Sequence, residues 1–122
     1  MTFVYAICVI VFVIFILIVL NSSKKEGITN SSNLEFFRFY NPKCGPCIAS
    51  EPQWKLFANS HKDIPINEID TTLQKNYNLV LSHNIKSTPT FLAFKNGVKY
   101  EFGKGPRTKE RFEKWLNHLQ KK

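Results

Sequence analysis

The sequence predicts an α/β domain that follows a single N-terminal membrane-spanning helix. Three features indicate this. Residues 3–20 contain no charge, proline or glycine. Beyond residue 33, short apolar runs typical of strands alternate with segments of helical spacing, in the order β-α-β-α-β-β-α. An Asn96-Gly97 pair between the last two strand-like runs marks a hairpin turn, because both residues tolerate positive φ.

The apolar run is long enough to cross a bilayer, because about 18 helical residues span the hydrocarbon core. The alternative is a cleaved signal peptide, whose apolar stretch is usually about 7–15 residues, preceded by a basic residue and closed by a small-x-small cleavage site. Residues 3–20 exceed that length and lack both flanking signals. We therefore expect residues 1–20 to be an uncleaved anchor in contact with the lipid bilayer, with Cys8 as a small apolar side chain.

Residues 21–33 are rich in Asn, Ser and Lys and are predicted to form a flexible tether. Residues 34–122 then form one small domain. The whole chain has a net charge of +8, and the basic residues of this domain are scattered along its sequence. We therefore expect a solvated basic surface. The sequence shows no aromatic-and-basic pattern of a nucleic-acid-binding protein.

The side of the membrane that the domain faces is indicated by two opposing signals. Lys24 and Lys25 follow the apolar run and no basic residue precedes it, which places the domain in the cytoplasm by the positive-inside bias. Glycosylation sequons begin at Asn21 and Asn30 and would be used only in a lumen. A cytoplasmic domain is our expectation, and a lumenal or other extracytoplasmic domain, or a viral membrane, stays open.

The first strand and helix of the domain flank a pair of cysteines. Residues 34–40 are apolar and aromatic, as expected of a buried strand. A helix-like segment reaches to about Ser60, and Pro52 inside it is expected to kink it. The cysteine pair lies at the turn between them, in the segment Cys44, Gly45, Pro46 and Cys47.

The rest of the domain is predicted as a strand, a helix, a hairpin and a final helix. Residues 64–69 form the short strand, and Asp70 or Thr71 caps a helix with one apolar face, made by Leu73, Tyr77 and Val80 or Leu81. The hairpin joins residues 90–94 to residues 98–102. The final helix, residues 108–120, places four apolar side chains at i, i+3, i+4 and i+7: Phe112, Trp115, Leu116 and Leu119.

Two thiols two residues apart at a strand-to-helix turn are able to close and reopen a small disulfide. Cys44 would lie at the helix N-terminus, where unpaired N–H groups and the helix dipole favour a thiolate. Only the thiolate attacks a disulfide. Cys47, one turn further along, is placed to attack the resulting mixed disulfide. The chemistry that the sequence predicts is thiol–disulfide exchange.

Four features in order resemble the thioredoxin superfamily over most of residues 34–119. They are residues 39–47, the proline five residues after Cys47, Thr88-Pro89-Thr90, and residues 94–97. The resemblance implies the minimal thioredoxin fold, a four-stranded mixed sheet, because no room exists for the family's usual first strand and helix. It also implies a redox disulfide between Cys44 and Cys47.

The same resemblance implies what the protein acts on. Its clients would be protein disulfides, contacted by Lys43, Gly45, Pro46 and a cis Thr88–Pro89 peptide whose backbone docks the client as an added strand. No cofactor is expected, since electrons would come from an external reductase or thiol donor. The Gly-Pro between the cysteines resembles reducing thioredoxins, whereas residues 39–42 and 105–108 resemble protein disulfide isomerases. Lys43 replaces the family's usual aromatic residue.

A further departure concerns the buried acid that assists the second cysteine in this family. Arg38 occupies that position, and Glu68 aligns with the lysine that partners the acid in isomerase-like members. We therefore predict a charge-swapped pair, since a buried charge is tolerated mainly when it is partnered. Glu68, or a water that it holds, would be the base for Cys47. The alternative is that Arg38 extends to the surface and Glu68 is solvated.

Three other functions are alternatives to disulfide exchange by a reducing enzyme. A zinc site needs four ligands, usually in two close pairs, and here one cysteine pair is joined only by three scattered histidines, His61, His83 and His118, so no metal is expected. A non-catalytic docking module that keeps the fold stays open. A disulfide isomerase or oxidant in a lumen stays open too.

Overall fold

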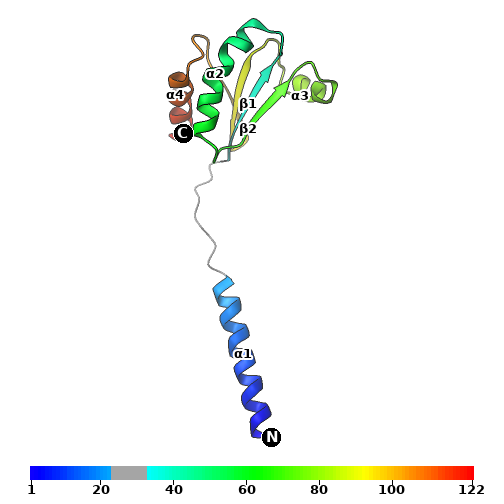
Figure 1. Ribbon diagram of the computed structural model, residues 1–122, viewed down its shortest axis with the longest axis vertical. Coiled ribbons are helices and arrows are strands. Elements are labelled where there is room, and N and C mark those ends of the chain that lie inside the picture. Colours follow the sequence, from blue (N-terminus) through cyan, green and yellow to red (C-terminus); the bar gives the residue numbers. More distant parts are fainter. Residues whose placement is uncertain (23–32) are drawn as a thin grey trace. The chain divides into compact units, whose positions relative to one another are not determined.

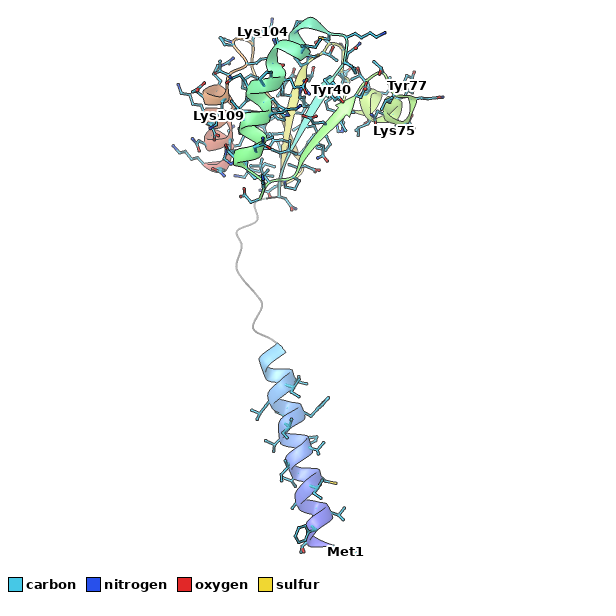
Figure 2. The ribbon with its side chains drawn as sticks, in the orientation of Figure 1. Met1, Tyr40, Lys75, Tyr77, Lys104 and Lys109 are labelled. Atoms are coloured by element: carbon cyan, nitrogen blue, oxygen red, sulfur yellow. The ribbon has the colours of Figure 1, made fainter. Side chains whose placement is uncertain are left out.

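The computed structural model describes residues 1–22 and 33–122, which fall into two separate units (Figure 1). The first unit holds helix α1, Thr2–Ser22. Its side chains from Phe3 to Val19 are exposed and project all round the helix (Figure 2). The length and composition of α1 suit either a membrane span or a signal sequence. Most of the tether predicted for residues 21–33 lies outside the described residues.

The second unit is built on a four-stranded mixed sheet, as predicted, and the strands lie in the order β2-β1-β3-β4. Strand β1, Leu34–Tyr40, is one of the two central strands and pairs in parallel with β2, Ile66–Asp70. On its other side β1 pairs antiparallel with β3, Thr90–Lys95, which in turn pairs with β4, Val98–Glu101. The parallel pair requires a crossover, and helix α2, Gly45–Ser60, supplies it. The end of β1 therefore leads directly into α2.

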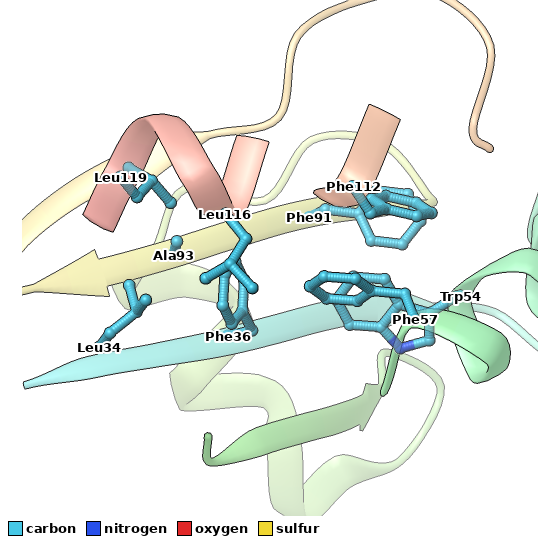
Figure 3. Packing of buried hydrophobic residues seen from close by; sticks show 9 residues of the cluster. All are labelled: Leu34, Phe36, Trp54, Phe57, Phe91, Ala93, Phe112, Leu116 and Leu119. Atoms are coloured by element: carbon cyan, nitrogen blue, oxygen red, sulfur yellow. The ribbon is translucent and has the colours of Figure 1, made fainter. Parts of the chain in front are cut away.

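Helices α2, Gly45–Ser60, and α4, Lys109–Gln120, lie side by side over one face of the sheet (Figure 1). The apolar face of α4 packs as its periodicity predicts, with Trp115 partly buried. Aromatic rings from both helices and both central strands fill the core between them (Figure 3). The core residues are Leu34, Phe36, Trp54, Phe57, Phe91, Ala93, Phe112, Leu116 and Leu119.

The predicted helix after β2 is broken into two short pieces, a 3₁₀ turn at Gln74–Asn76 and helix α3 at Tyr77–Ser82. Asp70 does not cap it. Its carboxylate instead accepts bonds from the N–H and hydroxyl of Thr72, at 2.9 and 2.6 Å. Such local side-chain bonds compete with helix formation. The predicted apolar face stays exposed at Leu73, Tyr77 and Leu81.

Element boundaries otherwise differ from the predictions by only a few residues. Strand β2 begins at Ile66 rather than residue 64, because Pro65 lacks an N–H and only its carbonyl pairs, with the N–H of Phe36. The hairpin turn has positive φ at Asn96 and Gly97, as predicted. Helix α4 begins after Thr108, whose hydroxyl caps it.

The basic residues of the domain are spread over its surface. Lys75, Lys104 and Lys109 project from three different parts of it (Figure 2). This arrangement agrees with the solvated surface expected from the sequence.

Candidate dithiol site

The two cysteines lie where β1 passes into α2. The turn between β1 and α2 is held by Asn41. Its carbonyl accepts the N–H of Cys44 at 3.0 Å, and its side chain accepts the N–H of Lys43 at 2.9 Å. Cys44 is the N-cap of α2, and Pro46 stands in the first turn, where a proline removes no helical hydrogen bond. The helix begins at Gly45, directly after this cap.

The two thiols have different surroundings, and both are free. Cys44 is partly exposed, and its Sγ accepts the backbone N–H of Cys47 at 3.3 Å. The same sulfur lies 3.5 Å from the carbonyl oxygen of Thr88. Cys47 is 1% exposed. One sulfur is therefore open to a substrate and the other is enclosed behind it.

These surroundings shift the two pKa values in opposite directions. Hydrogen bonding from Cys47 lowers the pKa of the Cys44 thiol. Partial desolvation raises this pKa, whereas a hydrogen bond with Thr88 and the charge of Arg107 lower it further. Burial raises the pKa of the Cys47 thiol, and the neighbouring sulfur of Cys44 raises it further. At neutral pH the pair favours a thiolate on Cys44 and a protonated Cys47.

The other residues predicted around the thiols differ in exposure: three next to Cys44 are exposed, Thr88 is partly buried and Pro89 is buried. Lys43, Gly45 and Pro46 are exposed next to Cys44. Thr88 and Pro89 are joined by a cis peptide bond, and Pro89 is buried. The carbonyl contact of Thr88 brings this peptide to the first sulfur.

Two residues that sequence reasoning left without a role also line the site. Arg107, in the loop before α4, lines a pocket with Pro46, Ala49 and Ser50. The Ser50 side chain is buried and donates to the carbonyl of Cys47 at 3.1 Å. Arg107 lies within residues 105–108, which resemble isomerase domains, and this resemblance is the sequence signal that could have pointed to Arg107 as a site residue. Ser50 sits one turn after Cys47, and its hydroxyl carries no distinguishing sequence signal.

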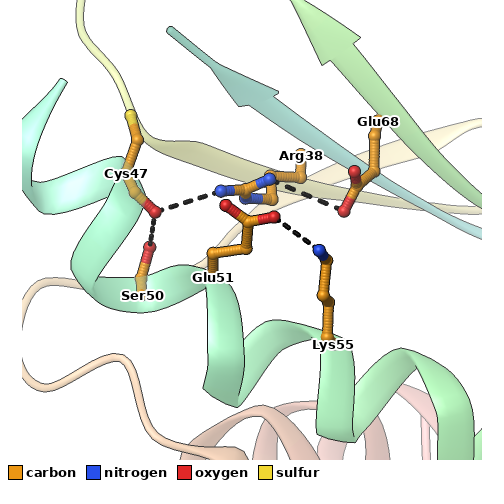
Figure 4. A network of polar contacts seen from close by, with 6 residues as sticks. All are labelled: Arg38, Cys47, Ser50, Glu51, Lys55 and Glu68. Atoms are coloured by element: carbon orange, nitrogen blue, oxygen red, sulfur yellow. Dashed lines mark hydrogen bonds and ion pairs between the residues drawn. The ribbon is translucent and has the colours of Figure 1, made fainter. Parts of the chain in front are cut away.

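Arg38 and Glu68 are brought together. They are directly opposite in the β1–β2 register, and Arg38 Nη1 lies 3.5 Å from Glu68 Oε1 (Figure 4). The Arg38 side chain is 1% exposed, so it does not extend to the surface, whereas that of Glu68 is 39% exposed. In Figure 4 the sulfur of Cys47 points away from Glu68, and Arg38 lies between the two residues. The role of Glu68 as a base stays a prediction.

A vicinal dithiol at the N-terminus of a helix, on a four-stranded mixed sheet with a cis-proline loop beside it, defines the class of thioredoxin-fold dithiol proteins. The family model described as Thioredoxin matches residues 16–118, and the chain belongs to this family. Its members are thiol–disulfide oxidoreductases.

Individual relatives agree with this assignment. A thioredoxin domain-containing protein of Theileria parva is 31% identical over 81% of this chain and 47% of its own length. Protein disulfide-isomerase TMX3 of Xenopus laevis is 33% identical over 82% of this chain and 22% of its own. The chain thus spans less than half the length of either relative. The crystal structure of oxidized thioredoxin O2 from Arabidopsis thaliana superimposes with a TM-score of 0.60 at 25% identity, over 70% of this chain and 74% of that one.

Proposed function

We propose that this protein is a thiol–disulfide oxidoreductase that acts on protein disulfides, with Cys44 as the attacking thiol and Cys47 as the resolving thiol. The observation that carries the proposal is the asymmetry of the pair. Cys44 caps α2, is partly exposed and receives the N–H of Cys47, while Cys47 is enclosed. A thiolate is the attacking species in disulfide exchange, and the site favours it on the exposed sulfur.

The reaction balances within the dithiol and one client disulfide. The Cys44 thiolate attacks one client sulfur, forms a mixed disulfide and releases the other client sulfur as a thiolate. Cys47 then loses its proton and attacks Cys44 Sγ. The Cys44–Cys47 disulfide forms and the second client sulfur leaves as a thiolate. Two electrons pass from the protein to the client, and an external reductase or thiol donor must return them.

The client would lie against the exposed surface around Cys44. Lys43, Gly45 and Pro46 form one side of this surface, and the backbone of Thr88, whose carbonyl oxygen lies 3.5 Å from Cys44 Sγ, forms the other. An extended client segment would pair with that backbone as an added strand. The absence of a side chain at Gly45 supports close approach, since no atom lies within 4 Å of a Cβ built there.

We further propose that residues 1–20 tether the domain of residues 34–122 to a membrane, with residues 3–20 in the bilayer. The uncharged helix α1 supports this. Lys24 and Lys25 favour a cytoplasmic domain, whereas similarity to a protein disulfide-isomerase favours a lumenal one. A mass increase from glycosylation at Asn21 or Asn30 in eukaryotic membranes would establish the lumenal side.

The test uses the full chain in detergent with Cys8→Ser. Cys47→Ser is expected to accumulate a mixed disulfide with a client peptide through Cys44, and Cys44→Ser to form none. In the chain that keeps both Cys44 and Cys47 and carries Cys8→Ser, glutathione titration measures the reduction potential of the pair. A value near roughly −270 mV indicates a reductase, and one near roughly −180 mV indicates an isomerase or oxidant of a lumen.

The remaining alternative is a docking module that holds clients without chemistry. It predicts that client binding survives replacement of both cysteines and that the pair shows no reversible couple. That combination of results would overturn the proposed exchange activity.

A further inference from the structure

Arg38 is a buried charge that the exchange steps above do not use. Its guanidinium lies under α2, and its carbon stands 4.6 Å from the centre of the Tyr40 ring. Nη2 donates to the carbonyl of Cys47 at 3.1 Å, and Nη1 pairs with Glu68 (Figure 4). Its buried Nε has no hydrogen-bond partner among the described residues. A buried guanidinium with incomplete compensation is destabilising, so its retention calls for a role beyond filling space.

The contact falls on the residue that carries the second thiol. The carbonyl of Cys47 accepts two side-chain bonds, from Arg38 and from the buried hydroxyl of Ser50. The bond from Arg38 attaches the first turn of α2 to β1, and the bond from Ser50 lies within α2. The attachment is at the residue whose sulfur must face that of Cys44. A neutral side chain of similar length would also pack there. Only a cation both donates to this carbonyl and places a permanent positive charge beside the backbone of Cys47.

We propose that Arg38 is a positioning residue of the exchange reaction: it fastens the first turn of α2 to the sheet, and its charge favours the Cys47 thiolate that resolves the mixed disulfide. This inference rests on the proposed function and deepens it. Glu68 offsets part of the charge. Because its side chain is 39% exposed and the pair is separated by 3.5 Å, water screens the offset and leaves Arg38 partly uncompensated.

Other charged and titratable groups face this site from every surrounding element. They are Tyr40 of β1, Glu68 of β2, Cys44, Glu51 and Lys55 of α2, and Arg107 of the loop before α4. Glu51 and Lys55 pair with each other at 2.6 Å, and the carboxylate of Glu51 also interacts with the charge of Arg38. Burial and the sulfur of Cys44 raise the pKa of Cys47. Hydrogen bonding with Asn41 and Thr88 acts in the opposite sense and lowers it. Arg38 is the buried cation among these groups, and in the proposed role its charge adds to this lowering.

The first experiment titrates Cys47 alone, in the full chain in detergent with Cys8→Ser and Cys44→Ala. The pH midpoint is read from the ¹³Cβ chemical shift of Cys47, which needs no access for a reagent and no client. Arg38→Met is expected to raise the midpoint by at least about half a unit, and Arg38→Lys to recover most of that shift. Glu68→Gln is expected to lower the midpoint, because it removes the negative partner of Arg38.

The control is Glu113→Gln. It removes a partly buried acid of α4 from its 2.7 Å contact with His61, the C-cap of α2, and is expected to leave the Cys47 midpoint unchanged. A folded Arg38→Met protein with an unchanged midpoint would overturn the proposal and leave Arg38 a structural role. If Arg38→Met does not fold, Glu68→Gln decides: a midpoint that rises or stays constant also overturns it.

A second readout measures resolution directly. With both cysteines present, Arg38→Met is expected to lengthen the life of the Cys44 mixed disulfide at least about threefold at pH 7, because a half-unit rise in the Cys47 midpoint lowers the fraction of thiolate about threefold. Glu68→Gln is expected not to lengthen it. A longer life in Glu68→Gln would assign the resolving step to Glu68 as a base and overturn the role of Arg38. Failure of the proposed function is distinguishable, since then no variant forms the mixed disulfide although Cys47 still titrates.

Discussion

The backbone N–H of Cys47 donates to Cys44 Sγ at 3.3 Å, so the turn of helix that carries the second thiol stabilises the thiolate of the first. The bond comes from the main chain and does not depend on the Cys47 side chain. The position of Cys44 as N-cap supplies it, because the first N–H groups of a helix have no partner within the helix.

The first prediction concerns the order in which the thiols react. In the full chain with Cys8→Ser, iodoacetamide at pH 7 is expected to alkylate Cys44 well before Cys47, because the pKa of Cys44 is lowered and that of Cys47 is raised by burial. Peptide mass mapping after brief labelling measures this. Denatured protein, in which both thiols are exposed, is the control and should lose the preference; a native preference for Cys47 would contradict the assignment.

The second prediction concerns the loop that carries Arg107. Gly105 has φ +120°, and a Cβ placed on it would stand 2.7 Å from Nη1 of Arg111. Arg111 holds the loop by donating to the carbonyls of Pro106 and Lys104, at 2.6 and 3.0 Å. We expect Gly105→Ala to lower the unfolding free energy of the domain by about 1–2 kcal/mol. Thermal unfolding followed by near-ultraviolet circular dichroism measures the change.

The matched control for that substitution is Gly103→Ala. No atom lies within 4 Å of a Cβ at Gly103, and its φ is outside the left-handed region. It is expected to leave the melting temperature nearly unchanged. Equal losses for the two variants would show that the loop geometry at Gly105 has no special part.

The third prediction concerns the end of α4. Lys95, the last residue of β3, donates through Nζ to the carbonyl of Leu119 at 2.6 Å, and so adds a charged donor to a carbonyl of the last turn that also accepts the N–H of Lys122 at 3.3 Å. A cation is also favoured at a helix C-terminus by the dipole. Lys95→Met is expected to reduce the unfolding free energy by about 1–2 kcal/mol. Lys114→Met, an exposed position of α4, is the control and should cause little change, whereas equal effects would refute the capping role.

The fourth prediction concerns pH and His83, whose ring packs against those of Phe37, Phe39 and Phe94. Burial, together with the charge of Lys99, lowers the pKa of His83 below its ordinary value of 6.5. The unfolded chain therefore binds the proton first, and stability is lost as the pH falls through about 6.5, down to the lower pKa of the folded state.

Denaturant unfolding of the domain at pH 7.5 and at pH 5.5 tests this. The original protein is expected to lose stability on acidification, and His83→Phe to lose less, because it removes the group whose protonation differs between the two states. His118→Gln, at an exposed position of α4, serves as the control and should keep the original slope. An unchanged slope in His83→Phe would contradict the assignment.

Most of the domain could be predicted from sequence because its signals are local. Proline, the Asn-Gly pair and the spacing of apolar residues act through the backbone torsions of their own neighbours. The predicted helix after β2 is present as α3, but its predicted start and its cap at Asp70 were wrong, because the bonds from Thr72 to Asp70 close a turn that a count of apolar spacing does not detect. The site was partly predictable for the same reason: Cys44 and Cys47 are neighbours in sequence, whereas Arg107 approaches Cys44 only through the fold.

By itself the sequence determined the dithiol, its place at a helix N-terminus and the apolar N-terminal helix, because each depends on residues within one or two turns of one another. Only the tertiary structure decided which thiol is enclosed, that the carbonyl of Thr88 approaches Cys44, and that Arg38 is buried against the carbonyl of Cys47 while it pairs with Glu68. Burial and the distances between charges arise from the packing of distant segments, and they set the free energy of each ionised form.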